Sequence, residues 1–215
     1  ALISAAMVTS MLGACGSNNA SSSSASSTAT SSVSASSASE EDTTAASSSV
    51  SASSASEEVS ADADQEAADK VAALIDAIYV QERNDNTDEQ CKEAKEAWDA
   101  LTDAQKELVE GENADPDYFG RDTGDASKDD PLNGDEIGEN ELLVVSFGTS
   151  FNDSRAEDIG GVEKALQAAY PDWSVRRAFT AQIIINHVQA RDDEKIDNVD
   201  QALERAVSNG VKNLI

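Results

Sequence analysis

Residues 142–146 read Leu-Leu-Val-Val-Ser, a continuous apolar run with β-branched members. Such a run is typical of a strand that is buried on both faces of a sheet. Further segments follow that we interpret as helices, at 153–169, 181–191 and 199–208, and as strands, at 174–178 and 211–215. Strands that alternate with helices of this length indicate parallel crossover units. We therefore predict an α/β domain with a parallel sheet over residues 141–215.

The last strand pattern reaches Ile215, the final residue of the chain. A central strand of a parallel sheet needs neighbours on both sides. We therefore expect residues 141–215 to be the first, truncated part of a longer domain, inactive and poorly folded when isolated.

Acidic side chains dominate the rest of the chain. The sequence has 42 Asp and Glu against 15 Lys and Arg, a formal net charge of −27, of which residues 141–215 carry only −4. This charge excludes nucleic acid as a partner, because binding to phosphates depends on Lys and Arg. One His and two Cys exclude a disulfide framework and a multi-thiolate zinc site. The sequence has no phosphate-binding glycine motif, so nucleotide chemistry has no support.

Residues 1–15 have the features of an export signal. The uncharged apolar stretch of residues 1–14 is too short to span a bilayer but fits the hydrophobic region of a secretory signal peptide. It ends in Leu-Gly-Ala-Cys, which resembles the bacterial lipoprotein cleavage box with Cys15 as the lipidated residue. We expect an exported protein that a lipid at Cys15 anchors to the bacterial cell membrane. A plain secretory signal with an incidental Cys is the alternative.

Residues 16–60 are rich in Ser and Ala and contain no Lys or Arg. The string SSVSASSASEE occurs at 31–41 and again at 48–58. Because this composition has little apolar surface to bury, it cannot offset the entropy cost of ordering the backbone. We predict a disordered tether between the membrane and a folded domain.

The apolar spacing in residues 61–111 predicts a small helical region. Val71, Leu74, Ile75 and Ile78 have the spacing of a buried helical stripe. A second helix begins at Thr87 or Asp88, and Thr102 to Gln105 fits a capping box that opens a third. Cys91 and Trp98 lie on the apolar face of the second helix, so we interpret both as core residues.

Residues 112–140 are rich in acidic residues, Gly and Asn, and we interpret them as a solvated acidic linker with Tyr118 and Phe119 docked locally. Asp129, Asn133 and Gly134 fit positions 1, 5 and 6 of a calcium-binding EF-hand loop. Two other ligand positions are Pro and Asn, which argues against a calcium site.

The final segment resembles a known family. The strings LLVVSFGTSFNDSR and WSVRRAFTAQIII, followed by NVDQALERAVSNGVKNLI, are similar to the start of the anaerobic cobalt chelatases, the sirohydrochlorin cobaltochelatases. This resemblance implies a ferrochelatase-like α/β fold and insertion of a divalent metal into a tetrapyrrole in cobalamin synthesis. Cobalt would be a substrate, with no resident cofactor. The metal-contacting His and Glu of the family lie further along the family's sequence, so we expect no catalytic residue in this chain.

Residues that follow the first two predicted strands are candidates for binding the tetrapyrrole, because ligands of α/β sheets gather at the carboxyl ends of strands. These candidates are Ser146, Gly148, Thr149, Ser150, Arg177, Phe179 and Thr180. Hydroxyl and backbone N–H groups could hold a substrate carboxylate, and an aromatic ring could pack on the macrocycle. A tight turn, core packing and surface ion pairing explain the same residues without a ligand.

His187 invites a catalytic role as the single His of the chain. It lies within a predicted helix, and we interpret it as non-catalytic. Two other functions stay open: a surface lipoprotein that captures a tetrapyrrole or metal without inserting it, and a structural adaptor.

Overall fold

The computed structural model describes residues 51–215, with side chains from residue 60 onward. The predicted signal peptide, Cys15 and most of the predicted tether lie outside the described residues. Helix α1 (Ser51–Ile78) begins at Ser51, inside the segment that the sequence assigns to the tether. In the described part of the chain, no helix combines the length and apolar character needed to cross a bilayer.

Three helices form the N-terminal region: α1, α2 (Thr87–Asp99) and α3 (Asp103–Lys106). Thr102 caps α3 with the predicted capping box, because its Oγ1 accepts from the Gln105 N–H and the Gln105 side chain accepts from the Thr102 N–H. Cys91 and Trp98 are buried in an apolar core with residues of α1, as the sequence predicts. Val71, Ile75 and Ile78 of α1 are buried in the same core and Leu74 packs against it, which confirms the predicted helical stripe.

Tyr118 and Phe119 dock on the helical region as predicted: both belong to its apolar core, where the Phe119 ring packs edge-on against Trp98. The prediction of a solvated linker over residues 112–140 is wrong at Asp129. Asp129 follows the short 3₁₀ helix η1 (Ala126–Lys128), and only 1% of its side chain is exposed. Its carboxylate accepts hydrogen bonds from two arginines, which also removes the calcium-loop interpretation. Sequence composition missed this because the charges that neutralise Asp129 lie far along the chain.

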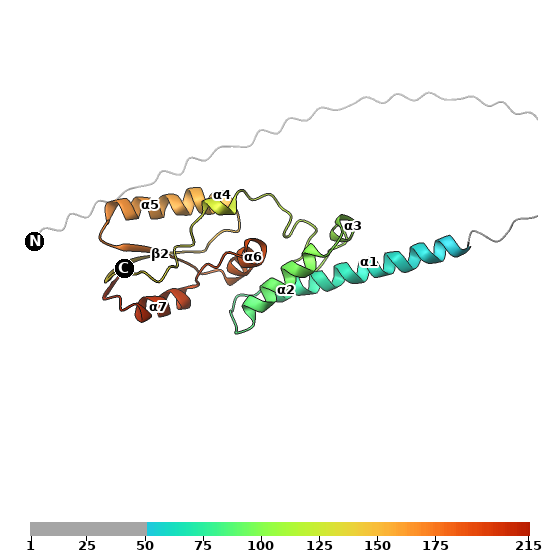
Figure 1. The fold of residues 1–215 in the computed structure, drawn as a ribbon, viewed down its shortest axis with the longest axis horizontal. Coiled ribbons are helices and arrows are strands. Elements are labelled where there is room, and N and C mark those ends of the chain that lie inside the picture. Colours follow the sequence, from blue (N-terminus) through green and yellow to red (C-terminus); the bar gives the residue numbers. More distant parts are fainter. Residues whose placement is uncertain (1–50) are drawn as a thin grey trace, which may run out of the picture. The chain divides into compact units, whose positions relative to one another are not determined.

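Residues 140–215 form the predicted parallel α/β unit (Figure 1). The strands β1 (Asn140–Ser146), β2 (Ser174–Phe179) and β3 (Asn213–Leu214) pair in the order β2-β1-β3, all parallel. The helices are α4 (Asn152–Ser154), the π-helical turn η2 (Arg155–Ile159), α5 (Gly160–Ala169), α6 (Gln182–Asp192) and α7 (Val199–Ser208). Helices α5 and α7 lie on opposite sides of the sheet, the arrangement expected of crossover units (Figure 1).

Helix α6 joins the α/β unit to the helical region. The Cys91 thiol donates to the Asn186 carbonyl over 3.5 Å, and the Asn186 side chain donates to the Ile78 carbonyl over 2.8 Å. Burial, with the charge of Asp88 adding to it, raises the pKa of the Cys91 thiol to about 11, so Cys91 is a neutral core residue.

Candidate functional site

The residues that follow β1 and β2 meet at the carboxyl edge of the sheet. We call residues 147–150 the FGTS loop; it follows β1 directly. The Thr180 N–H donates to the Ser146 carbonyl over 2.9 Å, and the Ala181 N–H donates to the Phe147 carbonyl over 3.3 Å. The structure therefore places the two predicted groups of site residues side by side, as parallel strands require.

Gly148 gives the FGTS loop its shape. Its φ is +94°, a conformation that side chains disfavour, and a Cβ built there would lie 2.4 Å from the Phe179 ring. The loop therefore turns directly over the end of β2. No larger residue fits at this position without moving the ring.

The FGTS loop carries polar groups that a ligand can use. Within residues 51–215, the N–H groups of Gly148, Thr149 and Ser150 donate to no backbone carbonyl. Successive N–H groups of this kind form anion-binding sites in other proteins. The Thr149 hydroxyl accepts from the Phe151 N–H over 3.1 Å and keeps a proton to donate. The Ser146 hydroxyl is buried, and it has no hydrogen-bond partner among the described residues.

Two aromatic side chains that the sequence analysis missed flank this loop. Phe147 is 65% exposed and Phe151 is 47% exposed. Both rings are therefore accessible to a ligand at this edge of the sheet. Their positions on either side of Gly-Thr-Ser were visible in the sequence, but nothing there showed that both rings point to solvent.

Phe179 and Arg177 do not have the roles predicted for them. Phe179 is completely buried, packed under Gly148 and within 5.8 Å of the Arg177 guanidinium, so its ring faces no ligand. Arg177 is 1% exposed and donates to Asp129 and Glu163 over 2.7 to 2.9 Å. Burial by itself lowers the pKa of Arg177, but these two carboxylates outweigh it and raise the pKa above its ordinary value. Arg177 is a core ion-pair residue.

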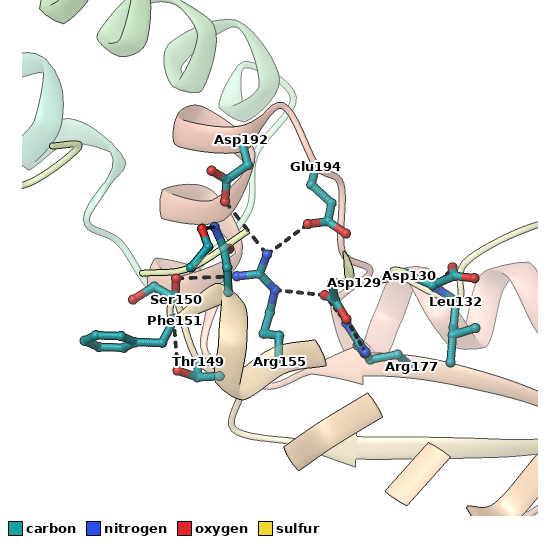
Figure 2. Close-up of polar contacts among 12 residues, drawn as sticks. Asp129, Asp130, Leu132, Thr149, Ser150, Phe151, Arg155, Arg177, Asp192 and Glu194 are labelled. Carbon is teal, nitrogen blue, oxygen red and sulfur yellow. Dashed lines mark hydrogen bonds and ion pairs between the residues drawn. The ribbon is translucent and has the colours of Figure 1, made fainter. Parts of the chain in front are cut away.

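A second buried arginine lies beside the FGTS loop (Figure 2). The Arg155 guanidinium donates to Asp129 and Glu194, each over 2.9 Å, and to the Ser150 carbonyl over 3.4 Å. Arg191 of α6 donates to the same carbonyl over 2.8 Å. The last residue of the loop is thus fixed by two cations.

The start of the following helix offers less to an anion than the sequence predicts. The Asp153 N–H donates to the Thr123 carbonyl over 3.0 Å, and the Arg155 N–H donates to the Phe151 carbonyl. The protein itself therefore uses the Asp153 donor of this helix terminus.

His187 is a packing residue, in line with its non-catalytic interpretation. Its ring stacks on Tyr118 with centroids 4.3 Å apart, and its Nε2 finds no hydrogen-bond partner in the described part of the chain. Burial, with Arg191 nearby, lowers the pKa of His187 to about 4, so the imidazole is neutral at pH 7. Ser146 and Ser150 form no hydrogen bond with it, which removes the Ser-His-Asp alternative.

Comparison with known proteins covers this same unit. Residues 140–215 match the family model described as cobalt chelatase (CbiK). The α/β segment of this chain is cobalt chelatase-like. Over 73 residues, 34% of this chain, the sequence is 41% identical to the sirohydrochlorin cobaltochelatase of Salmonella typhimurium. The chain spans 28% of the length of that relative. No solved structure matches the chain.

The cobalt chelatase match begins at β1 and includes the FGTS loop, both flanking phenyl rings and Thr180. It excludes the helical region and residues 112–139. Within the described residues, no group of three or more His, Cys, Asp or Glu side chains is arranged to hold a metal ion.

Proposed function

We propose that the protein carrying this chain inserts a divalent metal ion, cobalt, into a sirohydrochlorin-type tetrapyrrole, and that residues 140–215 form part of the wall of the substrate cleft. The match of this unit to the cobalt chelatases carries the proposal. The chain contributes to binding of the macrocycle, and the metal ion is a substrate.

The FGTS loop fits one task in that reaction, which is to hold the macrocycle by its edge and its face. Sirohydrochlorin-type tetrapyrroles carry several carboxylates around a flat apolar ring. The N–H groups of residues 148–150 and the Thr149 hydroxyl would hold a carboxylate, as backbone nests hold anions. Phe147 and Phe151 would pack on the ring, since exposed phenyl rings gain most from covering apolar surface. Thr180, exposed at the end of β2, would supply a further hydroxyl at this edge.

The test follows the absorbance of sirohydrochlorin mixed with Co²⁺ and the full-length protein. We expect conversion to the cobalt complex at a rate that is proportional to enzyme concentration and well above the uncatalysed rate. Tight tetrapyrrole binding without any rate enhancement would instead identify a capture protein, and absence of both would overturn the proposal.

We also propose that the protein is exported and anchored to the membrane through a lipid at Cys15. The sequence of residues 1–15 supports this, and the Ser-rich segment that follows fits a spacer between the membrane and the folded part of the chain. Expression in a bacterial host with labelled palmitate tests it. We expect label in the membrane-bound wild type and none in Cys15→Ser, whereas equal membrane association of both proteins would contradict a lipid anchor.

A further inference from the structure

A short segment outside the region matched to cobalt chelatases contacts the substrate loop from behind. We call residues 123–129 the brace segment. Its Thr123 carbonyl accepts from the Asp153 N–H over 3.0 Å, and its Gly124 carbonyl accepts from the Asn152 side chain over 3.2 Å. Both partners lie directly after the FGTS loop, in the first turn that follows it.

Asp129, at the end of the brace segment, is a buried acceptor for two arginines. Only 1% of its side chain is exposed, and its Oδ2 lies 2.9 Å from Arg155 Nε and 2.7 Å from Arg177 Nη1. Burial alone raises the pKa of Asp129, but the hydrogen bonds from Arg177 and Arg155 outweigh it and hold the pKa below its ordinary value. The carboxylate is therefore ionised at neutral pH and matches the charge of the buried guanidinium groups.

Arg155 transmits this contact to the loop (Figure 2). Its side chain is completely buried, and its orientation is set by Asp129 on one side and Glu194 on the other. With these two partners in place, Nη1 points at the Ser150 carbonyl, which also accepts from Arg191. Because the peptide unit is planar, fixing this carbonyl fixes the plane of the Ser150–Phe151 peptide.

We propose that Asp129 is a positioning residue for the FGTS loop: it orients Arg155, and Arg155 with Arg191 holds the Ser150 carbonyl so that the loop keeps one backbone conformation. The order of the loop follows from the contacts alone. The consequence for a tetrapyrrole rests on the proposed function. A loop held in one conformation loses less entropy when it binds, so its affinity is higher.

Hydrogen exchange of the loop amides in the full-length protein tests this directly, with mass spectrometry of peptides that cover residues 147–155. Asp129→Asn keeps the size of the side chain and removes the charge that Arg155 requires. We expect the hydrogen-bonded amides of Phe151, Asp153 and Arg155 to exchange at least about tenfold faster than in the wild type, because a weakened ion pair between Asp129 and Arg155 loosens the loop.

Asp130→Asn is the matched control. Asp130 is exposed, and its Oδ1 accepts from the Leu132 N–H, a bond that an Asn side chain can keep. The net charge changes equally in both variants. We expect wild-type exchange in Asp130→Asn, and faster loop exchange in both variants to the same degree would overturn the proposal.

Arg155→Gln covers the case in which Asp129→Asn destabilises the whole α/β unit. This variant leaves the ion pairs between Arg177, Asp129 and Glu163 intact and removes the bond to Ser150. Faster exchange confined to residues 147–155 supports the proposal. Protection of the loop equal to that of the wild type in a folded Arg155→Gln protein overturns it.

Steady-state kinetics at varied sirohydrochlorin concentration, with Co²⁺ present, separate positioning from stability. In Asp129→Asn and Arg155→Gln we expect KM to rise by about tenfold at a nearly unchanged kcat. A fall in kcat with unchanged KM, or unchanged kinetics beside a lower melting temperature, would show a structural role alone and contradict the proposal. If the wild type neither binds nor converts the tetrapyrrole, the proposed function fails, and the exchange experiment still decides the role of Asp129.

Discussion

The helical region and the α/β unit are stabilised in different ways. The interior of the helical region is an apolar cluster that includes Val71, Ile75 and Trp98. The α/β unit has a small apolar cluster around Phe179 and Ile185, and beside it a buried network centred on Arg155 and Arg177. The stability of the helical region comes from apolar area removed from water, and this hydrophobic effect is non-directional. The α/β unit depends on charges that must all be paired.

The ion network of the α/β unit is in contact with the candidate site. An intact buried ion network adds little net stability, whereas removal of one partner leaves an unpaired buried charge at high cost. In this chain the buried network donates a hydrogen bond to the Ser150 carbonyl of the FGTS loop, at the carboxyl edge of the sheet. The directional hydrogen bonds of this network therefore hold the backbone of the FGTS loop.

The largest expected effect comes from Arg177→Met, which leaves Asp129 and Glu163 without their shared cation. We expect a loss of about 3–5 kcal/mol in the free energy of unfolding, measured by urea denaturation. Arg121→Met is the control, because Arg121 is exposed and lies 3.9 Å from Asp115; we expect a change of about 0–1 kcal/mol. Equal effects of the two substitutions would refute the contrast between the regions.

Ile75→Ala tests the apolar side of the comparison. Ile75 is completely buried, so we expect a loss of about 2–4 kcal/mol that hardly changes between low and high salt. Leu108→Ala, at a half-exposed position, should cost less. If the loss in the free energy of unfolding caused by Ile75→Ala depended strongly on salt, the helical region would also rely on charge for its stability.

His187 links the two regions and makes their junction sensitive to acid. Its pKa is lowered to about 4 by burial, with Arg191 adding to the effect, so the unfolded chain binds a proton below about pH 6.5 while the folded chain does not. Stability is therefore full above pH 6.5 and falls between pH 6.5 and pH 4, by roughly 2–3 kcal/mol.

Two buried carboxylates work against this loss. Burial raises the pKa of Glu141 and Glu194, and each favours the folded state as it takes up a proton. In His187→Phe we expect the fall in stability between pH 6.5 and pH 4 to disappear. The pKa of His187 can also be measured directly by nuclear magnetic resonance, because it is the single His of the chain. An imidazole that titrates near pH 6.5 in the folded protein would contradict the buried stack on Tyr118.

Gly148→Ala probes the loop with the smallest expected effect on stability. The substitution forces a side chain into a positive φ and against the Phe179 ring, so we expect a loss of about 1–3 kcal/mol. Gly161→Ala in α5 meets no neighbouring atom and should be neutral or slightly stabilising. Equal thermal stability of the two variants would argue against the positive φ of Gly148 and its close packing on Phe179.

Local patterns were enough to predict the strands and helices of the α/β unit and the capping box at Thr102. They also predicted that the residues after β1 and β2 meet, because parallel pairing places their carboxyl ends together. These features depend on residues that lie close in sequence or follow from topology. Burial of Cys91 and Trp98 likewise follows from the spacing of one helix.

The roles of Asp129, Arg177 and Phe179 could not be predicted in this way. Asp129 pairs with residues 26 and 48 positions further along the chain, and no local pattern reports such a contact. Arg177 and Phe179 lie at the predicted edge, but they point into the interior, because β2 packs against α5 there through Glu163. The exposed aromatic side chains at this edge are Phe147 and Phe151 instead of Phe179.

The most direct test of the proposed binding surface is the dissociation constant of sirohydrochlorin for the full-length wild type, Phe147→Ala and the control Val207→Ala. Val207 is 80% exposed on α7 and lies outside the candidate site. We predict at least tenfold weaker binding, about 1.4 kcal/mol, for Phe147→Ala and wild-type affinity for Val207→Ala. Wild-type affinity in Phe147→Ala would contradict the assignment of the FGTS loop as the substrate-binding edge.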